Sequence, residues 1–372
     1  MSCDSSADGK FEVLNQPPTV TTQLPINDPS VSRFRYESLL QEHISSIHLS
    51  GATDITMGTE DQPRRETSFT SSAEIEEASP SYLHAATTSL QSWLGFGTDS
   101  VRSYRGKRVL VTGASSGIGA AFAEAFATRG AYLILTAHPN DKGELGELAD
   151  RLGREFGVEI ETLVADLSDP GGAQFIIDQV RPDAQPIDVL INNAGFATYG
   201  SFEQVPIESI VGLIQCNVVS AVRLTHAVLP SMRSRRAGEI VHTASIGAFF
   251  PMPFCATYCA TKAFLLRFSE ALWAENRSYG VEILALCPGP TDTNITKDSN
   301  FRLEPLGRME DAKDVVAAAL AALADGKSQV HSTSIGAIRT FVASLLPRRI
   351  VLGAALHTLK RCAVKVDSRK AI

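Results

Sequence analysis

A tyrosine and a lysine stand four residues apart in the sequence TYCATKAF, at Tyr258 and Lys262. If this stretch is helical, the two side chains lie on one face, one turn apart. A positive charge about 4 Å from a phenol is worth up to ~4 kcal/mol, which could lower the phenol pKa from about 10 toward 7, less whatever burial takes back. The pair then suits proton transfer near neutral pH. A bare Tyr-x-x-x-Lys is more often an ordinary helix with a solvated lysine, so other residues must decide.

Two further polar residues could belong to the same site. Ser245 ends an expected strand, thirteen residues before Tyr258, where it could either cap a loop or present its hydroxyl to a substrate. Asn217 stands in the middle of an expected helix, in IQCNVVSAV. Asparagine is unfavourable there, because its amide competes for backbone hydrogen bonds.

Short apolar runs alternate with longer amphipathic runs from residue 107 onward. The expected strands are 108–112, 132–137, 159–165, 187–192, 239–245 and 281–287. The expected helices are 117–130, 142–157, 171–180, 207–234, 257–279 and 312–325. Strands that alternate with helices need crossover connections and form a parallel sheet covered on both faces. The pattern predicts one α/β domain of the Rossmann type, with a doubly wound parallel sheet.

The first strand leads into the glycine-rich stretch TGASSGIG, residues 112–119. Gly113 would permit a tight turn, Gly117 a close backbone approach, and Gly119 the packing of the next helix on the strand. The N-terminus of that helix would offer free N–H groups to a pyrophosphate. Structural turns use the same residues, but the place of this turn favours a dinucleotide site.

Five motifs of this chain resemble those of the short-chain dehydrogenase/reductase family, in order and approximate spacing. The resemblance covers about residues 105–330 and is closest to broad-specificity reductases that are compared with hydroxysteroid and ketoacyl reductases. The motifs are TGASSGIG (112–119), NNAG (192–195), TAS ending at Ser245, YCATK (258–262) and PGPTDT (288–293).

The resemblance implies a catalytic tetrad of Asn217, Ser245, Tyr258 and Lys262. Tyr258 would be the general acid, Lys262 would lower its pKa and bind the ribose, and Ser245 would orient the substrate oxygen. Asn217 would hold a water in a proton relay behind the lysine. The implied contacts to an NAD(P) cofactor are Gly113, Ser115, Ser116, Gly117, Ile118, Gly119, His138, Asp166, Leu167, Asn193, Ala194, Gly195, Tyr258, Lys262, Pro288, Gly289, Thr291 and Thr293.

The end of the second expected strand, LTAHPND, bears on the choice between NADP and NAD. An acidic residue there would bind a ribose 2′-hydroxyl and repel a 2′-phosphate. Ala137 and His138 supply no acid, which favours NADP. The arginine of many NADP-dependent relatives is also absent, and Asp141 lies near enough to keep NAD open.

Two regions flank the expected catalytic domain of residues 105–332. Residues 1–104 form an acidic, Ser/Thr-rich arm; its first 100 residues carry 14 Asp/Glu against 5 Lys/Arg, and we expect it to be largely disordered. Residues 333–372 form a basic amphipathic helical tail. The favoured reading of the tail is packing on the sheet or on a second subunit. The other reading is peripheral contact with an anionic membrane surface.

Composition narrows the classes of partner and compartment. The net charge of −7 gives no reason to expect a nucleic-acid partner. The six scattered cysteines predict reduced thiols rather than a zinc site, so no metal is expected. We expect no bilayer span and no secretion signal, and hence a cytoplasmic protein that is peripheral at most. A homodimer or homotetramer is expected.

The expected activity is hydride transfer between NAD(P) and a carbonyl or alcohol group. Aromatic residues at 249–254 and 196–199, with the loop after Thr293, suggest an apolar ketone or aldehyde substrate. The same aromatics could equally be core packing. An alternative from another class is a non-catalytic cofactor-binding scaffold that acts through the N-terminal arm, but such proteins usually lose a tetrad residue.

Overall fold

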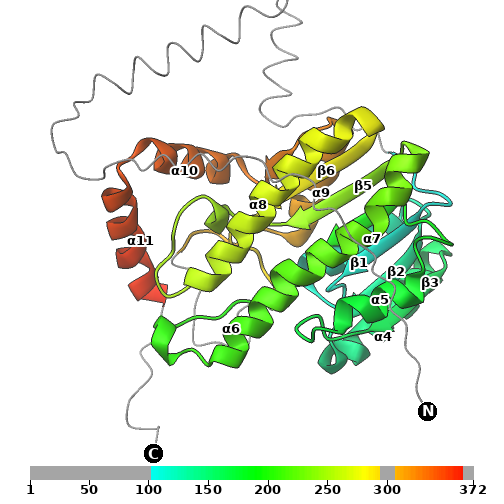
Figure 1. Ribbon diagram of the computed structural model, residues 1–372, viewed down its shortest axis with the longest axis horizontal. Coiled ribbons are helices and arrows are strands. Elements are labelled where there is room, and N and C mark those ends of the chain that lie inside the picture. Colours follow the sequence, from blue (N-terminus) through cyan, green and yellow to red (C-terminus); the bar gives the residue numbers. More distant parts are fainter. Residues whose placement is uncertain (1–101, 294–305, 363–372) are drawn as a thin grey trace, which may run out of the picture. The chain divides into compact units, whose positions relative to one another are not determined.

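The computed structural model describes residues 102–293 and 306–362 (Figure 1). The strands are β1 (Arg108–Thr112), β2 (Tyr132–Ala137), β3 (Ile160–Val164), β4 (Val189–Asn192), β5 (Gly238–Thr243), β6 (Val281–Cys287) and β7 (Gln329–His331). The helices are α3 (Gly117–Ala127), α4 (Lys142–Phe156), α5 (Gly172–Val180), α6 (Ile207–Ile214), α7 (Ser220–Arg235), α8 (Ala256–Asn276), α9 (Ala312–Ala324), α10 (Ser334–Leu345) and α11 (Arg348–Cys362).

The seven strands form one parallel sheet in the order β3-β2-β1-β4-β5-β6-β7. The chain adds strands outward from β1 to β3, then crosses back to place β4 on the other side of β1. Loops that leave the carboxyl ends of β1 and β4 therefore diverge, and in open α/β sheets ligands bind in the crevice that this switch creates. The doubly wound parallel fold predicted from the sequence is confirmed.

The two faces of the sheet are covered by different helices. Val109 and Val111 of β1 pack in a cluster with α3, α4 and α9. Leu110 points the other way and packs with α5 and α7. Alternate residues of a strand face opposite sides, and because both sides are covered here all three valine and leucine side chains are buried. Figure 1 shows α5, α7 and α8 together on the near face.

The predicted helix 207–234 is interrupted in the structure. It consists of α6, a π-helical turn at Gln215–Val219, and α7. A single π turn inserts one extra residue and often marks a functional site. The short strand β7, of three residues, was missed by the sequence analysis, because so short a run has no clear alternation.

Among the described residues, the run from Ile207 to Arg235 is long and apolar enough to cross a bilayer. No bilayer span was expected from the sequence, so this run is an addition from the structure. A core helix meets the same criteria of length and composition. Here α7 packs along β4, β5 and α5, with Leu224 and Val228 buried in the core, which supports a helix of the folded domain.

The flanking regions divide into described and undescribed parts. Residues 1–101, where most of the predicted acidic arm falls, lie outside the described residues, as does the loop 294–305 after Thr293. The predicted tail contains α10 and α11 up to Cys362. The described cysteines are all buried, as the sequence predicted for most of them: Cys216, Cys255, Cys259, Cys287 and Cys362.

Candidate active site

The glycine-rich loop lies at the switch point, between the carboxyl end of β1 and the start of α3. Gly113 adopts φ +63°, and a Cβ there would lie 2.8 Å from Cα of Ala194, so only glycine fits. A Cβ on Gly119 would meet the Gly113 carbonyl oxygen at 2.0 Å. The helix thus packs directly on the turn, and its first N–H groups are left facing the crevice.

Thr112, which the sequence analysis did not single out, joins the loops after β1 and β4. Its hydroxyl accepts hydrogen bonds from the backbone N–H groups of Asn193 and Ala194, each at 3.0 Å. The Asn193 amide in turn donates to the carbonyl oxygens of Thr112 and Gly113 at 3.1 and 3.2 Å. These bonds hold the predicted Asn193–Gly195 turn against the glycine-rich loop.

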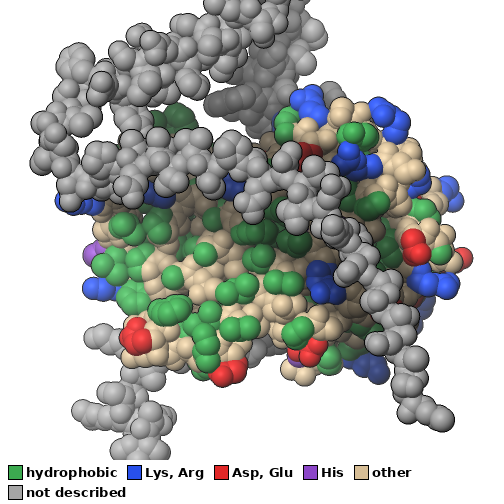
Figure 2. Space-filling view, in the orientation of Figure 1, with side chains coloured by type: hydrophobic (Ala, Val, Ile, Leu, Met, Phe, Trp, Pro, Cys, Tyr) green, Lys and Arg blue, Asp and Glu red, His purple; other side chains and the backbone are tan. Residues whose placement is uncertain are grey.

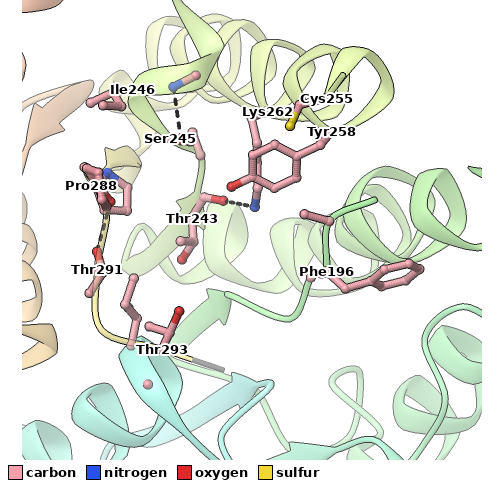
Figure 3. Close-up of a pocket in the computed structure, with 18 of the residues that line it drawn as sticks. Phe196, Thr243, Ser245, Ile246, Cys255, Tyr258, Lys262, Pro288, Thr291 and Thr293 are labelled. Atoms are coloured by element: carbon pink, nitrogen blue, oxygen red, sulfur yellow. Dashed lines mark hydrogen bonds between the residues drawn. The ribbon is translucent and has the colours of Figure 1, made fainter. Parts of the chain in front are cut away.

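Helix α8 brings Tyr258 and Lys262 to the same side, as their four-residue spacing predicts. The Lys262 ammonium group lies 5.7 Å from the centre of the Tyr258 ring. It donates to the carbonyl oxygen of Thr243, at the end of β5, over 2.7 Å. Figure 3 shows the Tyr258 hydroxyl and this ammonium group pointing toward Thr243 and Ser245.

The pKa of Tyr258 departs from the sequence expectation. Burial raises the pKa of the phenol above its usual value of 10, and a hydrogen bond with Ser245 only partly opposes that rise. Lys262 is also buried, and this burial lowers the pKa of its ammonium group to about 8. The sequence led us to expect a lowered phenol pKa, less the effect of burial; in the structure burial sets the direction, because desolvation disfavours the phenolate.

Ser245 fills the capping role that the sequence left open, and its presentation to a substrate stays a prediction. Its backbone follows β5, and its hydroxyl accepts a hydrogen bond from the N–H of Gly247 at 3.0 Å, which caps the short 3-10 helix Ile246–Ala248. The same hydroxyl lies within hydrogen-bonding reach of Tyr258. Its two lone pairs and one proton allow both contacts at once.

Asn217 lies in the π turn and is 1% exposed. Its side-chain oxygen accepts from the N–H of Phe196 at 3.2 Å, and its NH2 group donates to the Phe196 carbonyl at 3.1 Å and to Thr261 at 3.2 Å. The amide thereby fastens the segment after β4 to α8. These hydrogen bonds of the Asn217 side chain go to protein groups. The expected role of Asn217 in holding a water therefore stays a prediction.

Polar residues at the ends of β2 and β3 lie near one another. The His138 ring nitrogen Nε2 lies 3.5 Å from a carboxylate oxygen of Asp166, and its Nδ1 accepts from the N–H of Asn140. Burial acts to raise the pKa of Asp166, but hydrogen bonds from Ser168 and the nearby His138 outweigh it and lower the pKa. The Ser115 hydroxyl donates to Asp141 at 3.4 Å, so Asp141 faces the glycine-rich loop.

The segment Pro288–Thr293 is held by Glu310, another residue that the sequence analysis missed. The Glu310 N–H donates to the Pro290 carbonyl at 2.7 Å, and the Glu310 carbonyl accepts from the Asp292 N–H at 3.1 Å. The Glu310 carboxylate accepts hydrogen bonds from the hydroxyls of Ser332 and Thr333. The loop is thereby joined to the start of α10.

The sequence of residues 107–303 matches the family described as short chain dehydrogenase. This match covers more than half of the chain, including every motif described above. The chain belongs to the short-chain dehydrogenase family. Five of the motif positions that carry this likeness, Gly113, Asn193, Ser245, Tyr258 and Lys262, are among those that the fold brings to the crevice.

Relatives of this short-chain dehydrogenase carry the names of reductases and dehydrogenases. A very-long-chain 3-oxoacyl-CoA reductase of Anas platyrhynchos is 30% identical over 76% of this chain and 89% of its own length. A short chain dehydrogenase of Pseudocercospora fijiensis is 36% identical over 51% of this chain, a match that spans only 62% of that relative. A solved NADPH complex of a Sphingobium yanoikuyae short-chain dehydrogenase superposes with a TM-score of 0.58 at 35% identity, over 65% of this chain and 96% of that one.

One cavity of about 1230 Å³ joins these parts of the dehydrogenase. All of the predicted catalytic and cofactor residues line it except Gly119, which packs on β1, and Asn217, which lies behind Phe196. Phe250, Met252 and Tyr199, from the aromatic-rich segments, also line the cavity, and their contact with a substrate stays a prediction.

The two tail helices form another part of the cavity wall. Helix α10 contributes Val342 and Leu346, and α11 contributes Ala355 and Leu359. Leu359 also packs with Cys255 at the start of α8, next to Tyr258. The local sequence pattern of the tail predicts helices but does not show that they fold back over the cavity.

Proposed function

We propose that this protein is an NADPH-dependent reductase of an apolar ketone or aldehyde, with Tyr258 as general acid. The observation that carries the proposal is the convergence of Tyr258, Ser245 and Lys262 on one wall of the cavity. A cofactor crevice lies on one side of that wall and apolar side chains lie on the other. The NADPH complex of the Sphingobium yanoikuyae relative and the reductase names of others support the same reading.

The residues at the switch point fit a dinucleotide. The φ of +63° at Gly113 and the lack of room for a Cβ at Gly119 leave backbone N–H groups open toward the crevice. The end of β2 carries His138 in place of a carboxylate, so a 2′-phosphate would meet no negative charge from that strand. Asp141, which lies beside Ser115, is the nearby acid that would oppose it.

The bound cofactor would supply the hydride that reduces the carbonyl. Because burial raises the pKa of Tyr258, the phenol stays protonated, and this is the form that can donate to the oxygen as negative charge develops there. Ser245 would hold the same oxygen through a hydrogen bond. Lys262 would favour the resulting phenolate by its charge and contact the ribose hydroxyls.

The proposed substrate class follows from the walls beyond Tyr258. Phe250 and Met252, in the segment between β5 and α8, and Leu359 of α11 line the cavity, so a carbonyl at Tyr258 would carry its apolar part among them. Leu346 and Val351 extend this wall along the tail helices. Burial of such a part contributes roughly 25 cal/mol per Å² of apolar surface.

The test is to follow NADPH absorbance while purified protein meets a panel of ketones and aldehydes of increasing chain length. We expect turnover that rises with apolar size and that is lost in Tyr258→Phe. NADH is measured in parallel. Tight cofactor binding without turnover of any member would favour the scaffold alternative instead.

We also propose a cytoplasmic homodimer or homotetramer. Helix α6 exposes Ile207 and Val211 by 59% and 57%, and α8 exposes Phe264 by 41%. Figure 2 shows hydrophobic side chains gathered over α6. Solution mass by light scattering tests the assembly, and a monomer at micromolar concentration would contradict it.

A further inference from the structure

Helix α10 turns an apolar face to solvent. Ile335, Ile338, Phe341 and Leu345 are 63%, 60%, 64% and 69% exposed. Their spacing of three or four residues places them on one side of the helix. Scattered apolar residues are common on surfaces, but a contiguous row marks an interaction site.

Helix α11 continues this surface after the turn at Pro347. Ile350, Leu352 and Leu356 are 55%, 40% and 37% exposed. In Figure 1 α11 begins where α10 ends and runs at a steep angle to it. We call the exposed apolar residues of both helices, together with the basic residues beside them, the tail surface: Ile335, Ile338, Arg339, Phe341, Val342, Leu345, Leu346, Arg348, Arg349, Ile350, Leu352, Leu356, Lys360 and Arg361.

The charge of the tail surface has one sign. Residues 333–362 contain five Lys/Arg and no Asp or Glu, although the whole chain has a net charge of −7. All five basic residues are exposed. Arg348 and Arg349 begin α11, and Lys360 and Arg361 lie in its last turn. The cations therefore border the apolar residues at both ends of α11.

The same two helices also line the cavity. Ile338, Val342 and Leu346 belong both to the tail surface and to the cavity wall, and Val351 and Ala355 of α11 complete this part of the wall. The helices are anchored to the domain, since Thr340 contacts the His331 ring at 3.0 Å and Leu359 is buried against α8. The outward apolar face is thus fixed in position at the substrate end of the cavity.

The positive charge and the exposed apolar residues together indicate which partner binds the tail surface. A second copy bound face to face would bring two sets of five positive charges together, because a two-fold contact pairs a surface with itself. An anionic lipid leaflet instead offers negative headgroups to the basic border and acyl chains to the apolar row. A lipid surface therefore satisfies both features, whereas a second tail surface satisfies only one.

We propose that the tail surface docks on an anionic membrane, with α10 and α11 lying in the interface, and that apolar substrate enters the cavity from that side. The docking itself does not depend on the reductase activity, and only the entry of substrate rests on the proposed function. Attachment is peripheral, since both helices are amphipathic and neither has the length to span a bilayer.

The experiment is co-sedimentation of the full-length protein with vesicles of phosphatidylcholine, either alone or with about 30% phosphatidylserine. We expect at least tenfold stronger partitioning onto the anionic vesicles at low salt, and release at roughly 0.5 M NaCl. Phe341→Ser with Leu345→Ser should lower the partitioning about tenfold or more, because these side chains insert. Both side chains are largely exposed and lie outside the cavity wall, so folding should be kept.

A matched pair of charge variants isolates the basic border. Arg348→Glu with Arg349→Glu should abolish binding to anionic vesicles. Arg105→Glu with Lys142→Glu makes the same change of charge at exposed positions elsewhere, and should bind as the parent does. The two substitutions at the start of α11 suit the positive end of the helix dipole, so loss of binding would not reflect an unfolded helix.

Full-length protein that stays in the supernatant with anionic vesicles at low salt would overturn the proposal. So would equal binding by the two charge variants, or a fall in solution mass for Phe341→Ser with Leu345→Ser without any vesicle binding. Turnover of a water-soluble ketone should be unchanged in that apolar variant, whereas turnover of a long-chain ketone carried in vesicles should fall. Absence of all turnover would contradict the reductase proposal alone, because sedimentation needs no reaction.

Discussion

The ammonium group of Lys262 donates to the backbone carbonyl of Thr243 over 2.7 Å, which ties α8 to the end of β5. This lysine is 4% exposed, and burial lowers its pKa to about 8. A lowered pKa means that the charge is present below pH 8 and is lost as the pH rises through that value. If this charge binds the cofactor and stabilises the Tyr258 phenolate, turnover should fall about tenfold per pH unit above pH 8.

The pH dependence can be assigned to the lysine by direct binding. NADPH affinity of the Tyr258→Phe variant, measured by fluorescence titration, should weaken above pH 8 with the same midpoint. Lys262→Met should bind weakly at every pH and show no midpoint. An affinity that is flat from pH 7 to 10 in Tyr258→Phe would exclude Lys262 as the titrating group.

Tyr258→Phe should remove more than about 99% of turnover while NADPH binding stays within about twofold of the parent, because only the proton donor is lost. Steady-state kinetics and a binding titration measure the two quantities. Tyr279→Phe offers a tyrosine control in the short 3-10 helix Arg277–Tyr279, which does not line the cavity. Near-normal turnover of Tyr258→Phe would show that another group donates the proton.

NADPH should bind at least about tenfold more tightly than NADH, a difference of ~1.4 kcal/mol. His138→Asp should reverse this order, since it would place a carboxylate next to Asp166 at the end of β2 and repel a 2′-phosphate. His138→Asn is the neutral control and should keep the NADPH preference in weaker form. Equal affinities of the parent for both cofactors would contradict the assignment.

Glu310→Gln should raise the KM for cofactor about tenfold, or ~1.4 kcal/mol, and change kcat much less. The carboxylate accepts from Ser332 and Thr333, and a neutral amide accepts more weakly from both, so the Pro288–Thr293 loop would lose its support. Kinetics with the cofactor varied give the two parameters. Glu147→Gln, on the exposed side of α4, should leave both unchanged; a pure loss of kcat at Glu310 would argue against a positioning role.

Deletion of residues 1–100 should change the melting temperature by less than about 2 °C, under ~1 kcal/mol. Arg102 pairs with Glu239 at 2.8 Å, and Tyr104, which is 5% exposed, stacks edge-on against Phe126. Deletion of residues 1–105 removes both contacts and should lower the melting temperature clearly. Calorimetry of the two truncations checks this, and an equal loss in both would place stabilising contacts in the arm.

The sequence by itself determined the sheet, the glycine-rich turn and the pairing of Tyr258 with Lys262. These features depend on local spacing: alternate residues of a strand face opposite sides, and residues four apart in a helix share a face. Parallel strands bring their carboxyl ends to one edge, so Ser245 and Asn193 could be expected beside one another from chain order.

Only the tertiary structure decided what depends on distant parts of the chain. The direction of the Tyr258 pKa is set by how completely the surrounding residues exclude water, which no local pattern records. Asn217 reaches Phe196 because a π turn shifts the helix by one residue. The tail helices were evident from their apolar period, but their packing over the cavity, through Leu359 against α8 and Thr340 against His331, required the folded chain.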